Sequence, residues 1–425
     1  MCFSFFSGII DLKGGNTMKR RDSYLNQLVA FRDKPLIKVI TGIRRCGKST
    51  LLSLFEQHLL DVVVQSPQQI IRVNFESLEF DHITTYKALY QLLLSKMHDR
   101  SQRHYVLLDE VQQVPAWEKA VNSLLVDCDV DIYITGSNAY LLSSELSTLL
   151  TGRYIEIKMQ PLSFREYVDF HDGAVSQTPD ELFASFLRHG GFPLVVALKE
   201  NPETIAPFLS GIYNTVIMKD VVQRNQVRDP ALLESVIKFI AANVGNIVST
   251  KKISDYLTSS GRKTTSETID NYLRMLENAY VIYRANRYDL KGKLFLKTLE
   301  KYYLVDPGIR NHLTGFRNTD YGHILENVVY MDLLRRGFDV CIGKLNQFEV
   351  DFVATKTDKK IYFQVAATVL SESTRERELR PLQAIPDNYP KVILSMDRHI
   401  FSDFGGIQCV NIVDFLLQTQ GTPLV

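Results

Sequence analysis

Gly42-Ile43-Arg44-Arg45-Cys46-Gly47-Lys48-Ser49 fills every fixed position of the pattern G-x-x-x-x-G-K-[ST]. The residues before it, Leu36-Ile37-Lys38-Val39-Ile40-Thr41, are rich in β-branched side chains and predict a buried strand. The residues after it carry apolar side chains at positions 51, 52, 55 and 59, which predicts a helix. A strand, a loop and a helix N-terminus in this order form a cradle whose backbone N–H groups face a phosphate. The sequence therefore predicts a nucleoside triphosphate site, and we take the nucleotide to be ATP.

Two side chains of this loop have distinct predicted roles. Lys48 is expected to reach the β- and γ-phosphates and to assist catalysis, and the Ser49 hydroxyl is expected to bind Mg²⁺. The other positions contribute mainly through their backbone. The predicted nucleotide-binding residues of this stretch are Gly42, Ile43, Arg44, Arg45, Cys46, Gly47, Lys48, Ser49 and Thr50.

A second signature is His104-Tyr105-Val106-Leu107-Leu108-Asp109-Glu110-Val111, an apolar strand that ends in two carboxylates. Such a strand delivers Asp109 beside the phosphate loop, where it can bind the nucleotide-associated Mg²⁺. The adjacent Glu110 can act as the general base that takes a proton from the attacking water. An Asp-Glu pair also ends strands in proteins without this chemistry, but the complete phosphate loop in the same chain favours hydrolysis.

Three further residues are weaker predictions. Ser137 and Asn138 are the polar end of a further predicted strand, Val130-Asp131-Ile132-Tyr133-Ile134-Thr135-Gly136-Ser137-Asn138, which we expect to lie between the two strands already named. They are either sensors of the γ-phosphate or ordinary turn residues. Arg153 is either an arginine finger, which stabilises charge on the transferred phosphoryl group, or a member of a surface salt bridge.

These motifs, followed in order by Pro161-Leu162-Ser163-Phe164-Arg165-Glu166-Tyr167 and Gly190-Gly191-Phe192-Pro193, resemble a prokaryotic AAA-type ATPase family. Members of that family join an ATPase domain to a C-terminal domain of unknown function, the DUF4143 domain. The resemblance runs from about residue 18 to the C-terminus. It implies an α/β fold of the P-loop NTPase type, with a parallel sheet flanked by helices, similar to archaeal ATPases.

The bulk properties set the wider limits. The 49 basic and 48 acidic side chains leave a formal charge of +1, so bulk charge predicts neither nucleic acid nor an anionic membrane as a partner. The five cysteines form no C-x-x-C pair, which fits a reducing cytoplasm. No apolar run reaches the roughly 18 residues of a membrane span.

We expect Met18 to be the natural start of the chain. We divide the chain into a disordered extension (1–17), an ATPase domain (18–205), a helical domain (206–310) and a nuclease-like DUF4143 domain (311–425).

The sequence pattern of the helical domain predicts a winged helix. Three helical patterns, near 231–244, 250–258 and 264–280, precede two β-rich runs that read as a hairpin. In a winged helix the third helix can enter a DNA major groove. DNA is therefore one predicted partner, but winged helices also serve as lids or dock proteins, so a protein partner stays open. The basic residues available for phosphate contacts are Arg262, Lys263, Arg274, Arg284, Arg287, Lys291 and Lys293.

The sequence of the last domain predicts a restriction-endonuclease-like α/β fold in which the residues of the metal site are altered. A helical Glu326 and the strand carboxylates Glu349 and Asp351 have the order of a Mg²⁺-dependent nuclease. The next strand, however, reads Gln364-Val365-Ala366 where that arrangement needs a carboxylate and a lysine. We therefore expect no nuclease activity. DNA cleavage that depends on Asp351 is the opposing hypothesis.

Two functions follow for the whole chain. The first is a Mg²⁺-dependent ATPase that couples hydrolysis to rearrangement of its C-terminal domains. The second is a slow-turnover nucleotide switch that recruits a protein or DNA. The sequence does not decide the oligomeric state, nor whether Arg153 acts on its own site or on that of a neighbour.

Overall fold

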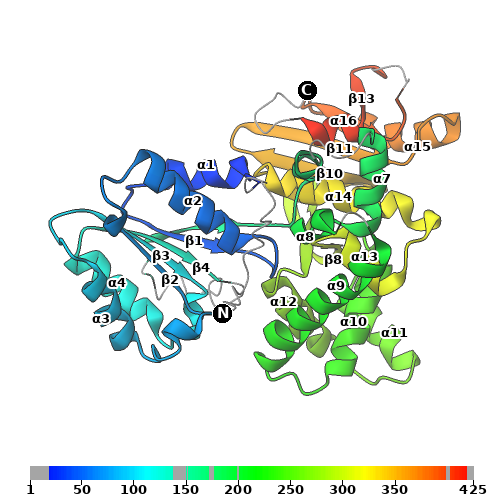
Figure 1. Ribbon diagram of the computed structural model, residues 1–425. Helices are drawn as coiled ribbons and strands as arrows, with labels where there is room; N and C mark the ends of the chain where they lie inside the picture. The colour runs from blue at the N-terminus through cyan, green and yellow to red at the C-terminus, as the bar shows by residue number, and fades with distance from the viewer. Residues whose placement is uncertain are drawn as a thin grey trace. The chain divides into compact units, whose positions relative to one another are not determined.

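The computed structural model of the chain describes residues 19–136, 150, 152–171, 177–198, 201–398 and 403–418, and Figure 1 shows its helices and strands. The predicted extension and Met18 lie outside the described residues. The chain divides after Gln160 into two compact units, each with its own sheet. Within the described residues, the structure has no helix with the length and apolar character needed to cross a bilayer.

The first unit contains a five-stranded parallel sheet with the order β2-β3-β4-β1-β5. Its strands are β1 (Ile37–Thr41), β2 (Ile70–Asn74), β3 (His104–Asp109), β4 (Val130–Thr135) and β5 (Tyr154–Lys158). Every residue of β1, β3 and β4 is buried, as expected for parallel strands that helices cover on both faces. β4 lies between β1 and β3, which confirms the predicted order of these strands.

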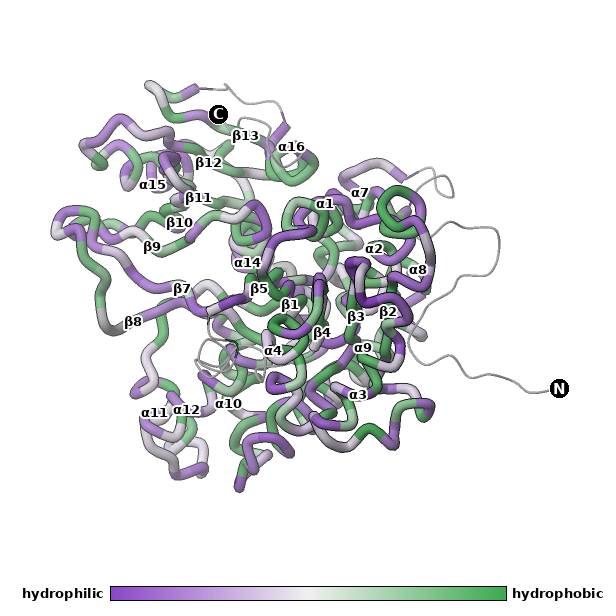
Figure 2. Tube along the Cα trace, turned by 90° about the vertical axis from the view of Figure 1, so that its left-hand side faces the viewer, coloured by the Kyte–Doolittle hydropathy of each residue, from purple (hydrophilic) through white to green (hydrophobic). Residues whose placement is uncertain are grey.

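Helices cover both faces of this sheet. α1 (Asp22–Phe31) and α2 (Lys48–Val62) lie on one face, and α3 (Tyr86–Lys96) and α4 (Trp117–Asp127) lie on the other (Figure 1). On the first face, Phe55 of α2 packs on Tyr133 of β4 with ring centroids 4.4 Å apart. Figure 2 shows hydrophobic residues along the strands, whereas the helices alternate between hydrophobic and hydrophilic residues. The core of the unit therefore lies on both faces of the sheet.

The second unit contains an eight-stranded sheet with the order β13-β12-β11-β10-β9-β7-β8-β6. The strands are β6 (Ile247–Val248), β7 (Ile282–Asp289), β8 (Leu294–Leu304), β9 (Asp339–Leu345), β10 (Phe348–Lys356), β11 (Lys359–Ala366), β12 (Lys391–Ser395) and β13 (Ile407–Asn411). The α-helices are α6 (Phe164–Phe170), α7 (Pro179–His189), α8 (Pro193–Ala197), α9 (Pro202–Thr215), α10 (Pro230–Ala242), α11 (Thr250–Ser259), α12 (Ser266–Asn278), α13 (Pro307–Thr314), α14 (Tyr321–Arg335), α15 (Glu372–Gln383) and α16 (Ile412–Leu417).

One pairing in this sheet crosses a predicted domain boundary. β7 belongs to the predicted hairpin and β9 to the predicted last domain, yet they pair in parallel from Arg287↔Ile342 to Asp289↔Lys344. The hairpin and the C-terminal strands therefore form one continuous sheet. The division at residues 310 and 311 falls inside a single compact unit.

The first division also differs from the predicted boundary near residue 205. β5 is the last strand of the parallel sheet, and the chain enters the second unit at Pro161. The helices that follow pack within that unit, α6 against α16 and α7 against α13. The sequence-based division places α6 and α7 in the ATPase domain, because the sequence alone does not reveal that they pack against helices far along the chain.

The Gly190-Gly191 turn is held by a buried carboxylate. Asp306 accepts hydrogen bonds from Gly191 N at 2.7 Å and from Gly308 N at 2.8 Å, and so caps the start of α13. Burial raises the pKa of Asp306 to about 6, against these hydrogen bonds, so the group is mainly ionised at neutral pH. Gly190 has φ +83°, and a Cβ there would overlap the Asp306 carboxylate. The turn therefore requires glycine for both conformation and space.

We predict that Gly190→Ala destabilises the second unit by about 3 kcal/mol, because the added Cβ displaces the cap of α13. Urea-induced unfolding followed by circular dichroism measures the change. Gly211→Ala is the matched control, since Gly211 lies in α9 and its Cβ would meet no atom within 4 Å. The free energy of unfolding of the Gly211→Ala control should stay unchanged or rise by up to about 1 kcal/mol. Equal effects of the two substitutions would contradict the role of the turn.

Candidate nucleotide-binding site

The predicted loop connects β1 to α2 at the carboxyl edge of the parallel sheet. Gly42 and Gly47 have φ angles of +136° and +103°, which L side chains rarely adopt. A Cβ at Gly42 would also overlap the backbone carbonyl of Met159. The loop therefore packs tightly on the segment that follows β5, and its first glycine has no room for a side chain.

Lys48 lies inside this loop. Its side chain is buried, and its Nζ donates to Gly42 O at 3.0 Å and Ile43 O at 3.1 Å. Gly47 caps α2, so Lys48 and Ser49 stand in the first turn of that helix. The Lys48 ammonium and the N-terminus of α2 thus both place positive charge at the phosphate loop, where it can bind a phosphate group.

Asp109, Ser49 and Thr135 meet beside the loop. Ser49 Oγ donates to Asp109 Oδ1 at 3.1 Å, and Thr135 Oγ1 donates to the same oxygen. Burial raises the pKa of Asp109, although these two hydrogen bonds oppose the rise. The second oxygen, Oδ2, is buried and has no hydrogen-bond partner. A buried carboxylate oxygen without a partner beside a hydroxyl fits Mg²⁺, which prefers oxygen ligands.

Glu110 follows Asp109 at the end of β3. Its φ of +54° turns the chain there, and its backbone N–H donates to Thr135 Oγ1 at 3.1 Å. The side chain is largely buried and accepts a hydrogen bond from Gln112 Nε2. The Thr135 hydroxyl therefore fixes both acidic residues, one through its side chain and the other through its backbone.

Two contributors to this site were missed in the sequence. Thr135 ends β4, and its place at the shared edge of the sheet could have identified it. Glu76 follows β2, whose Asn74 pairs with Asp109. Glu76 lies exposed at the rim, where partial removal from water and then the charge of Glu110 raise its pKa. It therefore adds a third carboxylate near the predicted base.

The structure does not bring Arg153 to this site. Ile37 N donates to Arg153 O at 2.8 Å, so Arg153 lies beside the first residue of β1. The loop follows the last residue, Thr41, and five residues at about 3.3 Å each put roughly 15 Å between the two ends of the strand. This position does not support action of Arg153 on its own site, one of the two alternatives that the sequence leaves open. Ser137 and Asn138 lie outside the described residues.

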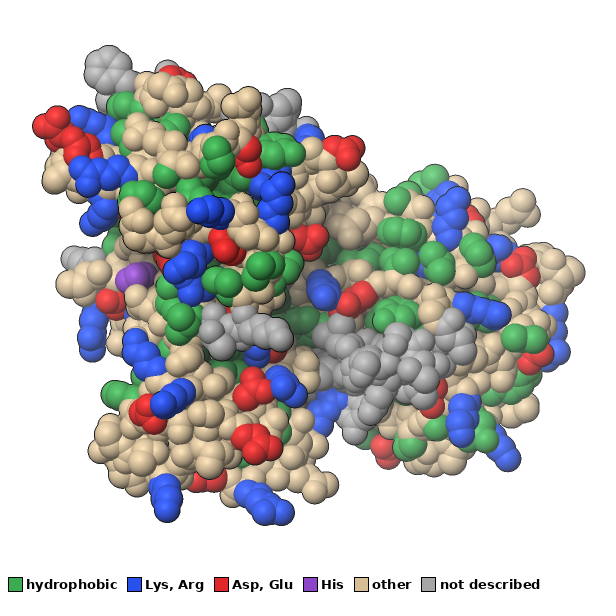
Figure 3. Space-filling model, turned by 180° about the vertical axis from the view of Figure 1, so that it is seen from behind, with side chains coloured by type: hydrophobic (Ala, Val, Ile, Leu, Met, Phe, Trp, Pro, Cys, Tyr) green, Lys and Arg blue, Asp and Glu red, His purple; other side chains and the backbone are tan. Residues whose placement is uncertain are grey.

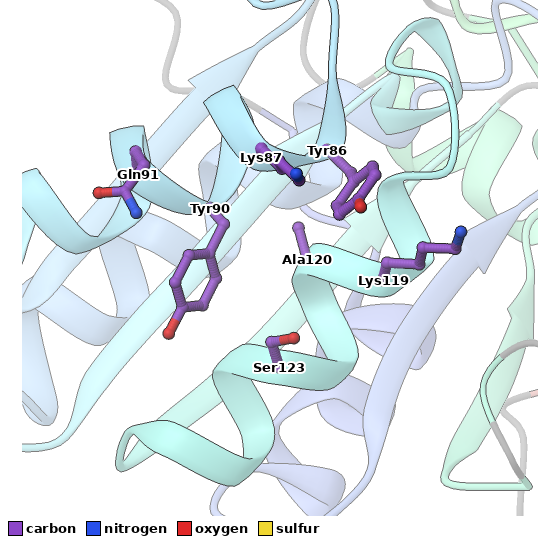
Figure 4. Close-up of a pocket in the computed structure, with 7 residues that line it drawn as sticks. All are labelled: Tyr86, Lys87, Tyr90, Gln91, Lys119, Ala120 and Ser123. Atoms are coloured by element: carbon purple, nitrogen blue, oxygen red, sulfur yellow. The ribbon is translucent and has the colours of Figure 1, made fainter.

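A shallow cavity elsewhere in the unit is separate from this site. It lies between α3 and α4, and none of the predicted nucleotide-binding residues lines it (Figure 4). Tyr90 at its edge donates to Asp127 at 2.6 Å. Its lining residues are Tyr86, Lys87, Tyr90, Gln91, Lys119, Ala120 and Ser123.

Two family models match the chain. An AAA domain matches residues 34–168, which include the phosphate loop and the Asp109-Glu110 pair. A domain of unknown function, DUF8612, matches residues 180–320. The part after the ATPase domain thus matches DUF8612, whereas the sequence resemblance had named DUF4143.

Known proteins match over most of the chain. An uncharacterized protein of Haemophilus influenzae is 43% identical over 403 residues, which are 94% of this chain and 99% of the relative. An uncharacterized protein of Methanocaldococcus jannaschii is 31% identical over 368 residues, 83% of this chain and 79% of the relative. Among solved structures, a Walker-type ATPase of Pyrococcus abyssi has a similar fold, with a TM-score of 0.50 at 16% identity over 70% of this chain and 96% of that one. The chain therefore belongs to the family of these two relatives, and its first unit carries an AAA-type P-loop ATPase domain.

Proposed function

We propose that this chain is a Mg²⁺-dependent ATPase that uses hydrolysis at the phosphate loop to rearrange its second unit. The observation that carries the proposal is the buried, unpartnered Oδ2 of Asp109 next to Ser49 and Glu110. A chain that only stored a nucleotide would not need a second acidic residue at this position. Mg²⁺ bound there would neutralise negative charge on the phosphates.

Each residue of the site has a distinct role in the proposed ATP hydrolysis. Lys48 exchanges its two carbonyl partners for phosphate oxygens, and the loop N–H groups hold the rest of the phosphate chain. Asp109 and Ser49 hold the metal. Glu110 accepts the proton of the attacking water, with its backbone oriented by Thr135.

The contacts of the loop support coupling to the second unit. Arg21 Nη1 donates to Cys46 O in the loop at 3.0 Å and to Gln160 O at 2.8 Å. Met159 N donates to Thr41 O at 2.8 Å, and the Met159 carbonyl packs on Gly42. A loop that adjusts to nucleotide must therefore push on residues 159 and 160, which lead directly into the second unit.

Arg153 retains a proposed role only between chains. It is exposed at the amino edge of the sheet, far from its own phosphate loop. We therefore assign it to the site of a second copy of the chain, where its guanidinium would stabilise phosphoryl charge.

For residues 230–304 we propose a winged helix that docks protein surface rather than reading DNA bases. The order of α10, α11 and α12 before β7 and β8, with β6 paired to β8, supports the fold. Two of the basic residues predicted for DNA are engaged elsewhere: Arg284 pairs with Glu277 at 2.6 Å, and Arg274 pairs with Asp270 at 2.6 Å. Figure 3 shows Lys and Arg scattered among Asp and Glu on the visible face of this unit, without the continuous basic stripe that DNA binding favours.

We predict that Lys48→Ala weakens the binding of a non-hydrolysable ATP analogue roughly 10- to 100-fold, or leaves binding and abolishes hydrolysis. The first effect corresponds to about 1.5–3 kcal/mol for lost charged hydrogen bonds. Isothermal titration calorimetry measures binding. Lys119→Ala is the control: Lys119 is an exposed residue of α4, and this variant should bind as the wild type does. Normal hydrolysis by Lys48→Ala would mean that the reaction occurs elsewhere.

We predict that Glu110→Gln slows single-turnover ATP hydrolysis by about 10²- to 10⁴-fold, because it removes the general base and keeps the shape of the side chain. ATP should still bind. The exposed Glu79→Gln serves as the control. Wild-type turnover at the background rate, unchanged by Glu110→Gln with or without duplex DNA, would overturn the ATPase proposal in favour of a nucleotide switch.

A further inference from the structure

A buried lysine in the second unit lies among the three carboxylates that the sequence assigned to a nuclease-like centre. Lys301 Nζ is 2.8 Å from Glu326 Oε1, 2.9 Å from Glu349 Oε1 and 3.9 Å from Asp351 Oδ1. The three carboxylates come from α14 and β10, whereas Lys301 comes from β8 of the hairpin. The chain thus brings a positive side chain from a preceding element into the middle of the acidic cluster.

Neighbouring protein groups form hydrogen bonds with the carboxylates of this cluster. Tyr303 donates to Glu326 Oε1 at 2.6 Å, and Val365 N donates to Asp351 Oδ2 at 2.9 Å. Gln364, which stands where a nuclease needs a carboxylate, accepts from Asp351 N at 3.0 Å and donates to Glu378 at 3.0 Å. The Lys301 side chain is only 4% exposed.

The charge of Lys301 is stable in this place. Burial alone would lower its pKa, but the charges of the surrounding carboxylates outweigh burial and raise the pKa above the ordinary value. A buried ammonium of this kind needs opposite charges at hydrogen-bond distance. Of the three carboxylates, Glu326 is buried, whereas Glu349 and Asp351 are partly buried. Burial and then the charge of Glu326 raise the pKa of Asp351 to about 8, and the charge of Lys301 opposes this rise.

We propose that the Lys301 ammonium occupies the position that a divalent cation holds in a metal-dependent nuclease of this fold. The nuclease-like centre thereby becomes an internal ion cluster that joins the hairpin strand β8 to α14 and β10. The cluster does not bind Mg²⁺ or cleave DNA. This inference concerns the second unit alone and does not depend on ATP hydrolysis in the first.

The test removes the ammonium and offers a metal in its place. Lys301→Met keeps an unbranched side chain, one atom shorter than that of lysine, but leaves the three carboxylates without a cation. In the absence of nucleotide, electron paramagnetic resonance of free Mn²⁺ counts the ions bound to the full chain. We expect Lys301→Met to bind one more Mn²⁺ than the wild type and to lose that ion in the double variant with Asp351→Asn. Lys293→Met, at the exposed tip of the hairpin, should bind as the wild type does.

A comparison of the wild type with Asp351→Asn keeps the test decisive if Lys301→Met does not fold. The two proteins should bind the same number of Mn²⁺ ions, and neither should cleave duplex DNA. A wild-type Mn²⁺ site that Asp351→Asn abolishes, or Mn²⁺-dependent cleavage by the wild type, would overturn the proposal. A folded Lys301→Met protein that gains no Mn²⁺ would overturn it as well.

Discussion

The packing of Gly42 on the backbone of Met159 is the contact on which the site depends. β1 lies between β4 and β5, so the residues after β5 run directly beside the start of the phosphate loop. Met159 N continues the sheet bonding to Thr41 O at 2.8 Å, and its carbonyl fills the space where a Cβ of Gly42 would lie. Only glycine satisfies both the close approach and the positive φ. The loop therefore has its shape because the exit segment of the unit supports it.

Hydrogen bonds also connect the phosphate loop to the end of the first unit. Arg21, at the start of α1, binds the carbonyls of both Cys46 and Gln160. In the second unit, Arg335 donates to Pro161 O at 3.2 Å. The last residue of the first unit and the first residue of the second thus each accept a hydrogen bond from a guanidinium of their own unit. In the proposed function, a change in the loop is passed to this segment.

The sequence predicted features that depend on local order and missed those that depend on distant pairing. The phosphate loop and the Asp109-Glu110 strand each lie within a few consecutive residues, and parallel strands bring their carboxyl ends together without further information. The motif around Arg153 does not reveal the edge of the sheet at which the residue lies, so the sequence left open whether Arg153 acts on its own site or on that of a neighbour. Glu76 and Thr135 follow no motif, although Thr135 ends β4 and Glu76 follows β2 at the same edge of the sheet.

The second unit shows the same limit more strongly. The order Glu326, Glu349, Asp351 was visible in the sequence, and so was the altered strand at Gln364. The cation that faces these carboxylates was not, because Lys301 lies on a strand that the pattern assigned to another domain. The parallel pairing of β7 with β9 unites those domains, and such pairings between distant segments leave no periodic signal.

Hydrogen exchange at residues 159 and 160 tests the central claim, that the phosphate loop controls the exit segment, most directly. The account predicts that Mg²⁺-ATP, added to Glu110→Gln protein, changes exchange of the Met159 and Gln160 amides together with those of the loop. Arg21→Ala, which removes the hydrogen bond to Gln160 O, should weaken the response at residue 160 when nucleotide is saturating. Strong protection of the loop amides with no change at residues 159 and 160 would contradict the account.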